Sequence, residues 1–290
     1  MYGRYASIKR RSLLKHVEEI LVRREPPQCS NSEAAFERLQ AEYAGVPEYG
    51  YDALSTWKRG ADRAAALLTL DPKLKSPGAR ILDAGCGDGM TAYLLATFGH
   101  EATVSDAEDW RDARARSLPF VEGDLAKPGL TPENHFDLVC TYNSFEHFSD
   151  PGTVLQQLVR ACVPGGMLYL EFGPLYCGPW GLHAYRTLRM PYPQFLFSRG
   201  FIGKKLDELG IEDLGRKRTS LQPVNGWRLA QFRDLWARSG CEVLRCDVKW
   251  VDTGLLRLIK EFPEAFRGRE LTLEDVLAQS LTVLLRRPAI

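Results

Sequence analysis

Short apolar runs alternate with helically spaced apolar residues through the middle of the chain. Apolar and β-branched runs bounded by turn residues predict strands, and apolar residues three and four positions apart predict helices. From residue 79 the predicted order is strand, helix, three strands, helix, strand. The predicted strands are 79–83, 101–106, 118–122, 136–141 and 167–172, and the predicted helices are 90–98 and 152–162. This alternation predicts a mostly parallel sheet that is covered by helices on both faces.

The N-terminal part of the chain has a helical pattern. Apolar residues between Leu13 and Leu21 share one face of a helix, and Pro26 and Pro27 end that segment. We predict that residues 1–70 form an N-terminal helical cap.

The alternation stops at residues 173–225, which are rich in Gly, Pro and aromatic residues. It resumes with a predicted helix at 228–239 and predicted strands at 241–249 and 281–285, which bring the strand total to seven. We therefore predict a doubly wound, seven-stranded α/β domain over residues 71–290, in which 173–225 form a lid insertion that binds the substrate.

The composition excludes several classes of protein. With 290 residues, 44% hydrophobic and 26% charged, the chain is ordinary for a globular protein. No apolar run approaches the ~20 residues of a membrane helix, so no membrane partner is expected. The formal net charge of +1 gives no general attraction to nucleic acid. Seven cysteines without a C-x-x-C pair argue against disulfides and a zinc site, so we expect a reducing, cytoplasmic location and no metal.

The most informative motif is the glycine cluster Asp83-Ala-Gly-Cys-Gly-Asp-Gly89, which lies between a predicted strand and a predicted helix. Its three glycines have no side chains, so a ligand can lie against bare backbone. A dinucleotide fingerprint needs a glycine at position 90, which is Met here. Asp83 and Asp88 would repel a pyrophosphate but suit an adenosine ligand with a positive charge. S-adenosylmethionine, with its sulfonium and ammonium groups, is such a ligand.

This cluster resembles the first motif of class I S-adenosylmethionine-dependent methyltransferases. The similarity continues in order through Asp106, Asp124, the segment Phe136 to His147, and Pro164-Gly-Gly166, and covers residues 78–172. The resemblance implies a Rossmann-like methyltransferase fold, S-adenosylmethionine as cofactor and S-adenosylhomocysteine (SAH) as product. Pro164-Gly-Gly166 is expected to be a helix stop and turn without a chemical role.

The resemblance also implies a role for each cofactor-site residue. The glycine loop would pass the methionine part, with Asp83 near the ammonium group. Asp106 would bind the ribose hydroxyls, while Asp124 and the Leu125 amide would bind adenine and Asn143 would border the methyl group. The complete set implied at the cofactor is Asp83, Gly85, Cys86, Gly87, Gly89, Asp106, Asp124, Leu125 and Asn143.

Plainer alternatives remain open at several of these positions. Asp106 and Asp124 could be turn residues or helix caps, and Glu108 or Asp109 could replace Asp106 at the ribose. Cys86 is expected to be a small packing residue and not a catalytic thiol. Arg59 and Arg63, just before the first strand, are candidates for binding the methionine carboxylate, although solvated helix positions are the simpler interpretation.

Methyl transfer from a sulfonium is an in-line displacement, so positioning is the main task, and a hydroxyl acceptor also needs a base. His147 and His183 follow predicted strands at the expected active-site edge and are the candidate bases.

The acceptor pocket is predicted in the lid, with Tyr176, Trp180 and Tyr185 as candidate substrate-binding residues. The lid aromatics could equally form a satellite core or a homodimer surface. The remaining histidines are expected at the surface or in turns; they are His16, His100 and His135.

The leading hypothesis is a methyltransferase that acts on a small-molecule or natural-product acceptor, at a hydroxyl or alternatively at an amine or carbon. One alternative is an RNA or protein methyltransferase, which would need a basic groove beside the cofactor. Another is a non-catalytic scaffold subunit that keeps the methyltransferase fold. The acids at 83, 106 and 124 argue against this last alternative.

Overall fold

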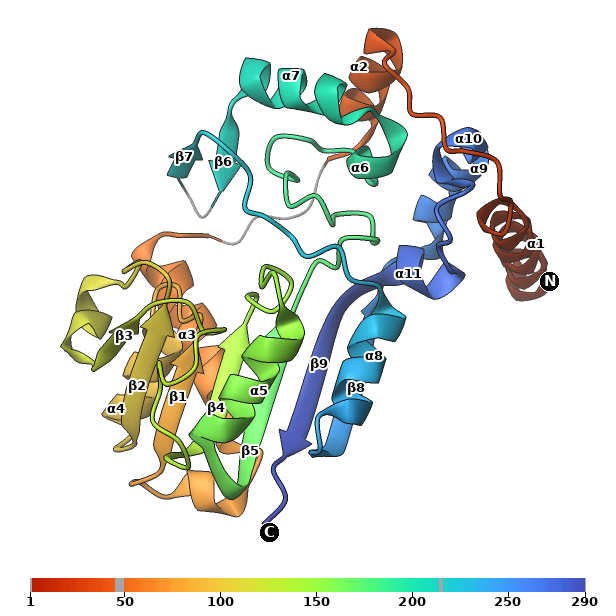
Figure 1. Cartoon of the computed structure of the whole chain (residues 1–290). Helices are drawn as coiled ribbons and strands as arrows, with labels where there is room; N and C mark the ends of the chain where they lie inside the picture. The colour runs from red at the N-terminus through yellow and green to blue at the C-terminus, as the bar shows by residue number, and fades with distance from the viewer. Residues whose placement is uncertain (1, 45–49, 214–215, 290) are drawn as a thin grey trace. The chain divides into compact units, whose positions relative to one another are not determined.

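The computed structural model describes residues 2–44, 50–213 and 216–289 (Figure 1). The chain divides into two compact units. The sheet unit comprises Tyr49–Gly173, Ala230–Asp247 and Leu281–Ile290. The cap unit comprises Met1–Glu48, Pro174–Leu229 and Val248–Ser280. The predicted cap range 1–70 therefore spans parts of both units.

A seven-stranded sheet organises the sheet unit, with the order β3-β2-β1-β4-β5-β9-β8. The strands are β1 (Arg80–Ala84), β2 (Glu101–Asp106), β3 (Phe120–Glu122), β4 (Phe136–Tyr142), β5 (Cys162–Phe172), β8 (Glu242–Trp250) and β9 (Ala278–Arg286). Strands β3, β2, β1, β4 and β5 pair in parallel, and β9 is antiparallel to β5. The predicted doubly wound, mostly parallel sheet of seven strands is confirmed.

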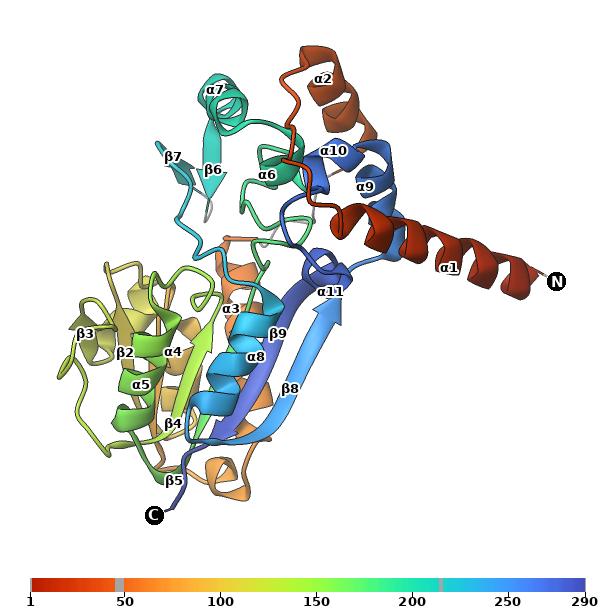
Figure 2. The ribbon, with the colours of Figure 1, turned by 45° about the vertical axis from the view of Figure 1, so that its right-hand side comes forward.

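Helices cover both faces of this sheet (Figures 1 and 2). One face carries α3 (Ala53–Leu68) and α4 (Met90–Thr97), and the other carries α5 (Pro151–Ala161) and α8 (Leu229–Arg238). Leu67 of α3 joins a buried cluster with Ile81 and Leu138 of the sheet. On the opposite face, Trp236 of α8 packs against Phe172 of β5, with ring centroids 6.3 Å apart. The alternating side chains of the strands thus bury apolar groups on both faces.

Strand β5 begins earlier than predicted. It starts at Cys162, which pairs with Phe136, so Pro164-Gly-Gly166 lies within the strand and is not a separate turn. The register shifts between Phe136 and Leu138, and Gly165 has φ of +79°, a conformation that favours glycine. The Pro-Gly-Gly segment therefore forms an irregularity inside the strand.

His100 lies directly after the turn that follows α4, but it is not a surface residue, because only 5% of its surface is exposed. Its Nδ1 accepts a hydrogen bond from the Ala79 amide at 3.2 Å, and its Nε2 lies 3.1 Å from the Leu74 carbonyl oxygen. A carbonyl only accepts, so Nε2 carries the proton. Burial lowers the pKa of His100, which is therefore a neutral structural residue.

The cap unit is built mainly from helices, most of them short. They are α1 (Tyr2–Leu21), α2 (Glu33–Glu42), α6 (Pro193–Leu196), α7 (Arg199–Leu209), α9 (Arg257–Glu261), α10 (Pro263–Phe266) and α11 (Leu273–Leu277), with a hairpin of β6 (Ile211–Asp213) and β7 (Arg216–Arg218). One buried cluster joins them and includes Val17, Leu39, Tyr192, Phe197 and Phe266. Several aromatic residues of the predicted lid thus lie in the core of this unit.

Among the described helices, none combines the length and the apolar character needed to cross a bilayer.

Candidate functional site

The glycine loop connects β1 to α4 at the carboxyl edge of the sheet. Gly85, Gly87 and Gly89 have φ values of +70°, +53° and +68°, which non-glycine residues rarely adopt. No described atom lies within 4 Å of the position that a Cβ of Gly87 would take. A ligand can therefore approach the backbone at Gly87, as the sequence predicted for this loop.

Asp106, the last residue of β2, is hydrogen-bonded into this loop. Its Oδ2 accepts from the Gly87 amide at 2.9 Å, and its Oδ1 accepts from the Ala107 amide at 2.8 Å. Burial raises the pKa of the Asp106 carboxyl, while these backbone bonds oppose the rise. The Glu108 amide is a further backbone donor to this carboxylate, which has about four acceptor positions and so keeps capacity for a ribose hydroxyl.

The neighbouring acid Asp109 has a different partner. Arg111 holds its carboxylate through Nε at 2.8 Å and Nη2 at 2.9 Å, and this hydrogen bonding lowers the pKa of Asp109 to about 2. Asp109 is therefore committed to Arg111. Of these two acids, Asp106 is the better candidate for binding a ribose.

Asp83 lies beneath the loop with 3% of its surface exposed. Burial raises its pKa to about 7, with opposition from Arg63 and reinforcement from Asp88 and Asp106. The site therefore combines three acids: Asp83 of β1, Asp106 at the end of β2, and Asp88 of the glycine loop. Such an arrangement favours a cationic ligand over a pyrophosphate.

Cys86 has no features of a nucleophile. Burial raises the pKa of its thiol far above the ordinary value, and the charge of Asp83 raises it further. A thiol in that environment stays protonated at neutral pH, and the thiolate is the reactive form. The structure therefore supports a packing role for this side chain.

Two arginines of α3 were candidates for the methionine carboxylate from their position in the sequence, and the structure gives their contacts. Arg59 Nη2 lies 2.6 Å from Asp88 Oδ2, and Nη1 lies 3.0 Å from the Gly50 carbonyl oxygen. The Arg63 guanidinium lies 4.3 Å from the centroid of the Tyr142 ring. Among the described residues no acceptor forms a hydrogen bond with Arg63, so this half-buried cation has capacity to bind an anion.

The remaining cofactor candidates follow β3 and β4. The Gly123 amide donates to the Asp106 carbonyl oxygen at 2.9 Å, so the turn after β3 adjoins the end of β2. Asp124 is exposed, and its Oδ1 accepts from the Ala126 amide at 2.9 Å, as in a local turn. Leu125 is buried, and Asn143 is exposed at the end of β4 with φ of +50°.

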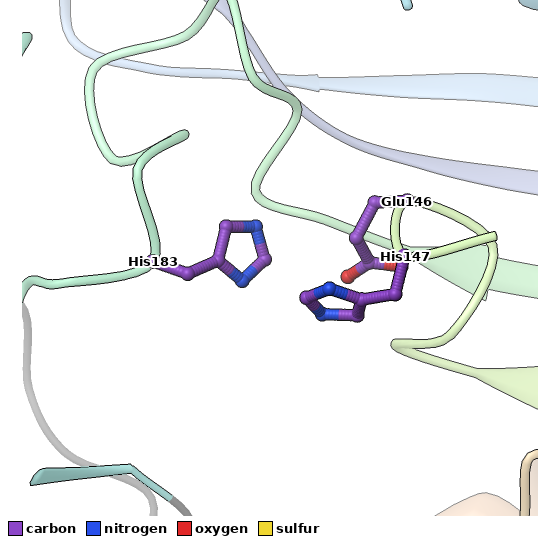
Figure 3. A group of neighbouring side chains, drawn as sticks. All are labelled: Glu146, His147 and His183. Atoms are coloured by element: carbon purple, nitrogen blue, oxygen red, sulfur yellow. The ribbon is translucent and has the colours of Figure 1, made fainter. Parts of the chain in front are cut away.

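The loop after β4 contains a buried acid that the sequence prediction did not include as a site residue. Glu146 accepts from the Gly173 amide at 3.0 Å through Oε1, while no described group hydrogen-bonds to its buried Oε2. Burial raises the pKa of Glu146 to about 8, so it holds a proton at neutral pH. Its neighbour His147 is half-buried, and the His147 backbone amide donates to the Ser144 carbonyl oxygen at 2.9 Å. Figure 3 shows the side chains of both residues leaving this loop.

His183, also drawn in Figure 3, belongs to the segment that follows β5. Its Nε2 lies 2.8 Å from the Pro174 carbonyl oxygen, and because a carbonyl only accepts, Nε2 carries the proton in the neutral ring. The residue has φ of +58°, which is strained for a non-glycine residue. Its backbone is thus held in an unusual conformation by its surroundings.

The three candidate substrate-binding aromatics belong to the same segment of the cap unit, and all are half-buried. The Tyr176 ring packs edge-on against Phe195 with centroids 5.9 Å apart. The Tyr185 ring centroid lies 6.5 Å from that of His183, and Trp180 precedes both in the chain. Tyr192 and Phe197 are buried, whereas these three residues each keep part of their surface exposed.

The chain is similar to known proteins over the region that carries this geometry. A family model described as "Methyltransferase domain" matches residues 56–245. The chain is 29% identical over 119 residues to a ubiquinone biosynthesis O-methyltransferase of Caulobacter vibrioides, covering 38% of this chain and 47% of that protein. It is 33% identical over 106 residues to a tRNA 5-carboxymethoxyuridine methyltransferase of Escherichia coli, covering 32% and 40%. The chain thus spans about half the length of the curated relatives it matches.

Among solved structures, magnesium protoporphyrin IX methyltransferase from Synechocystis with bound SAH aligns with a TM-score of 0.45 and 17% identity. That alignment covers 88% of this chain and 94% of the other. The family model itself extends over well more than half of the present sequence. The chain therefore belongs to the methyltransferase domain family, within the class I S-adenosylmethionine-dependent methyltransferases.

Proposed function

We propose that this protein transfers a methyl group from S-adenosylmethionine to a hydroxyl group of a small-molecule acceptor. The observation that carries the proposal is the link between Asp106 and the glycine loop. The Asp106 carboxylate at the end of β2 accepts from the Gly87 amide at 2.9 Å and has acceptor capacity left for a ribose. The same loop is anionic and lacks side chains, which suits a cationic adenosine ligand.

The residues of the sheet unit fit this cofactor. Asp106 would hold the ribose, Asp124 and Leu125 the adenine, and Asn143 would border the methyl group. The open backbone at Gly87 would let the ligand lie against the loop. The bound cofactor supplies a methyl group activated by the positive sulfur, so the protein needs only to align the acceptor and to remove a proton.

Arg63 is the residue that we assign to the methionine carboxylate. Its guanidinium stacks on Tyr142 at 4.3 Å and has no hydrogen-bond acceptor among the described residues. Arg59 is less suited, because Asp88 and the Gly50 carbonyl already occupy its guanidinium. A fixed cation beside Asp83 also matches a zwitterion, whose ammonium would favour the ionised form of that acid.

A small acceptor is favoured over RNA by two features of the chain. Its formal net charge is +1, so the whole protein has no general attraction to phosphates. Tyr176, Trp180 and Tyr185 are half-buried rings suited to an apolar or aromatic molecule. The relative from Caulobacter vibrioides acts in ubiquinone biosynthesis by its name, whereas the Escherichia coli relative is a tRNA methyltransferase. RNA is therefore the alternative that an acceptor assay must include.

For a hydroxyl acceptor, His183 and His147 are the proposed bases. His183 is placed first because its Nε2 donates to the Pro174 carbonyl oxygen at 2.8 Å, which fixes the tautomer of the imidazole ring. A neutral amine can attack the sulfonium before it loses its proton, so an amine acceptor would not depend on a base in the methyl-transfer step.

The cofactor assignment is tested by calorimetric titration with SAH, with NAD as the control ligand. Micromolar binding of SAH and none of NAD is expected. Arg63→Met should weaken SAH binding by about tenfold or more, since it removes a charged hydrogen-bond donor. Lys58→Met, an exposed position on the same helix, is the matched control and should leave the affinity unchanged. Absence of SAH binding to the folded protein contradicts the proposal.

The acceptor is tested by measuring methyl incorporation from labelled S-adenosylmethionine. One substrate set is a panel of phenols and other small hydroxyl compounds, and the other is bulk RNA. Incorporation into a small compound supports the proposal. Incorporation into RNA alone, with the steep salt dependence of phosphate binding, would replace it with the RNA alternative.

A further inference from the structure

The outermost strand of the sheet, β8 (Glu242–Trp250), has an unprotected edge. It is the last strand in the order β3-β2-β1-β4-β5-β9-β8, and no strand among the described residues pairs with its outer side. Nearly every residue of β8 is exposed, including apolar Val243 at 43% and Trp250 at 46%. The outer edge therefore presents a row of backbone donors and acceptors together with apolar side chains.

The two ends of the sheet differ in how they are protected. The opposite edge strand, β3, spans only Phe120–Glu122, and short edge strands resist pairing. In contrast, β8 is nine residues long and contains neither Pro, which cannot donate to a neighbouring strand, nor Gly, which weakens a strand. A strand with these properties is suited to pair with another strand.

The sequence of β8 is complementary to itself in one register. A two-fold axis normal to a sheet pairs two copies of one strand antiparallel, with the central residue opposite its own counterpart. With Cys246 at the centre, Arg245 of each copy lies opposite Asp247 of the other, and Leu244 lies opposite Val248. With Arg245 or Asp247 at the centre, like charges lie opposite each other instead, which is unfavourable.

Arg245 and Asp247 also contact each other within one strand. Arg245 Nε lies 2.9 Å from Asp247 Oδ2, so both side chains project from the same face of β8. In the register centred on Cys246, two such pairs would meet as a ring of four alternating charges. Each carboxylate would then lie between two guanidinium groups, at an edge where the backbone groups also become paired.

We propose that two copies of this chain associate through their β8 strands, which pair antiparallel about a two-fold axis at Cys246. The two seven-stranded sheets then continue into one another, and the side chains of the two β8 strands become cross-strand neighbours. This inference does not depend on the proposed catalytic function, because it uses only the strand at the edge of the sheet.

Charge exchange tests both the interface and its register. Arg245→Glu and Asp247→Arg each place like charges opposite one another twice, and each should weaken the dimer by about tenfold or more. The double variant Arg245→Glu with Asp247→Arg restores opposite charges and should restore the dimer. A mixture of the two single variants should also associate, as a heterodimer in which every facing pair has opposite charge.

Sedimentation velocity over a concentration series is the measurement. Arg238→Glu, which changes an exposed charge of α8 in the same sense, is the matched control and should leave the dimer unchanged. A wild-type protein that stays monomeric at high micromolar concentration overturns the proposal. So does a dimer that withstands both single exchanges.

The position of the axis is tested by the thiol itself. Directly opposed residues of an antiparallel pair have Cα atoms roughly 4.5–5.5 Å apart, within the range that a disulfide can bridge. Mild oxidation should therefore link two chains through Cys246, and Cys246→Ser should abolish the link. A dimer whose oxidation yields no link through Cys246 contradicts this register.

Discussion

Replacement of Asp106 by asparagine tests the cofactor site most directly. The substitution keeps the size and one acceptor oxygen but removes the charge and puts an amide NH2 in place of the other oxygen. In the structure both oxygens are used, by the Gly87 amide at 2.9 Å and the Ala107 amide at 2.8 Å. One of these amides would therefore face a donor, and the ribose would lose a charged acceptor.

The size of the effect follows from these bonds. A hydrogen bond to a charged group contributes roughly 1.5–3 kcal/mol, and a tenfold change in affinity corresponds to about 1.4 kcal/mol. Loss of one such bond to the ribose should weaken SAH binding by about 10- to 100-fold. The altered contact with Gly87 would disturb the loop and would add to this loss.

Calorimetric titration with SAH measures the effect, and a thermal melt of each variant checks that the protein is folded. Asp109→Asn is the matched control, because Asp109 lies three residues away and is bound by Arg111. It should change SAH affinity by less than about threefold. If Asp109→Asn abolishes SAH binding and Asp106→Asn does not, the ribose assignment is wrong and Asp109 takes the place of Asp106.

Four further predictions concern ionisable groups. Burial raises the pKa of Asp83 to about 7, and the ammonium group of bound SAH would favour its ionised form. SAH affinity should therefore rise between about pH 6 and 8 with proton release, measured by calorimetry in buffers of different ionisation enthalpy. A flat profile would contradict this role. Cys86→Ala should keep turnover within about twofold of wild type, because the protonated thiol takes no part in the reaction. His183→Ala should lower the turnover of a hydroxyl acceptor by about 100-fold or more while SAH affinity is retained; near-normal turnover in both this variant and His147→Ala would exclude a histidine base. Because the pKa of His100 is lowered in the folded state, the unfolded chain binds a proton that the folded chain does not. The contribution of His100 to stability is therefore complete above about pH 6.5 and decreases as the pH falls below that value. His100→Gln should flatten the pH dependence of the unfolding free energy below about pH 6.5, measured by urea denaturation.

Much of the sheet unit could be predicted from local patterns. The predicted strand 79–83 and helix 90–98 correspond to β1 (Arg80–Ala84) and α4 (Met90–Thr97), because a buried parallel strand is a continuous apolar run and a glycine cluster ends it. The start of β5, predicted at residue 167, lies at Cys162. Pro164-Gly-Gly166 has the composition of a turn, but the pairing of Cys162 with Phe136 continues the strand before it.

The cap unit could not be assembled from the sequence, because its contacts join distant segments. Phe266 of α10 packs edge-on against Tyr192 with ring centroids 5.4 Å apart, and both belong to the cluster that contains Val17 of α1. No local period reveals that residues near 17, 192 and 266 share one core. The burial of His100 was not predicted for the same reason, since its partners Leu74 and Ala79 lie 26 and 21 residues earlier in the chain.

This difference between local patterns in the sheet unit and long-range contacts in the cap unit explains why the cofactor was easier to predict than the acceptor. In the order β3-β2-β1, each strand is the spatial neighbour of the next in sequence, so acids placed at successive strand ends must converge. The hydrogen bonds that the Gly87 and Gly123 amides donate to Asp106 follow directly from that strand order. The acceptor candidates belong to the cap unit, whose arrangement depends on its own non-local core. A motif can therefore identify the methyl donor, whereas the acceptor must be found by testing compounds against the protein.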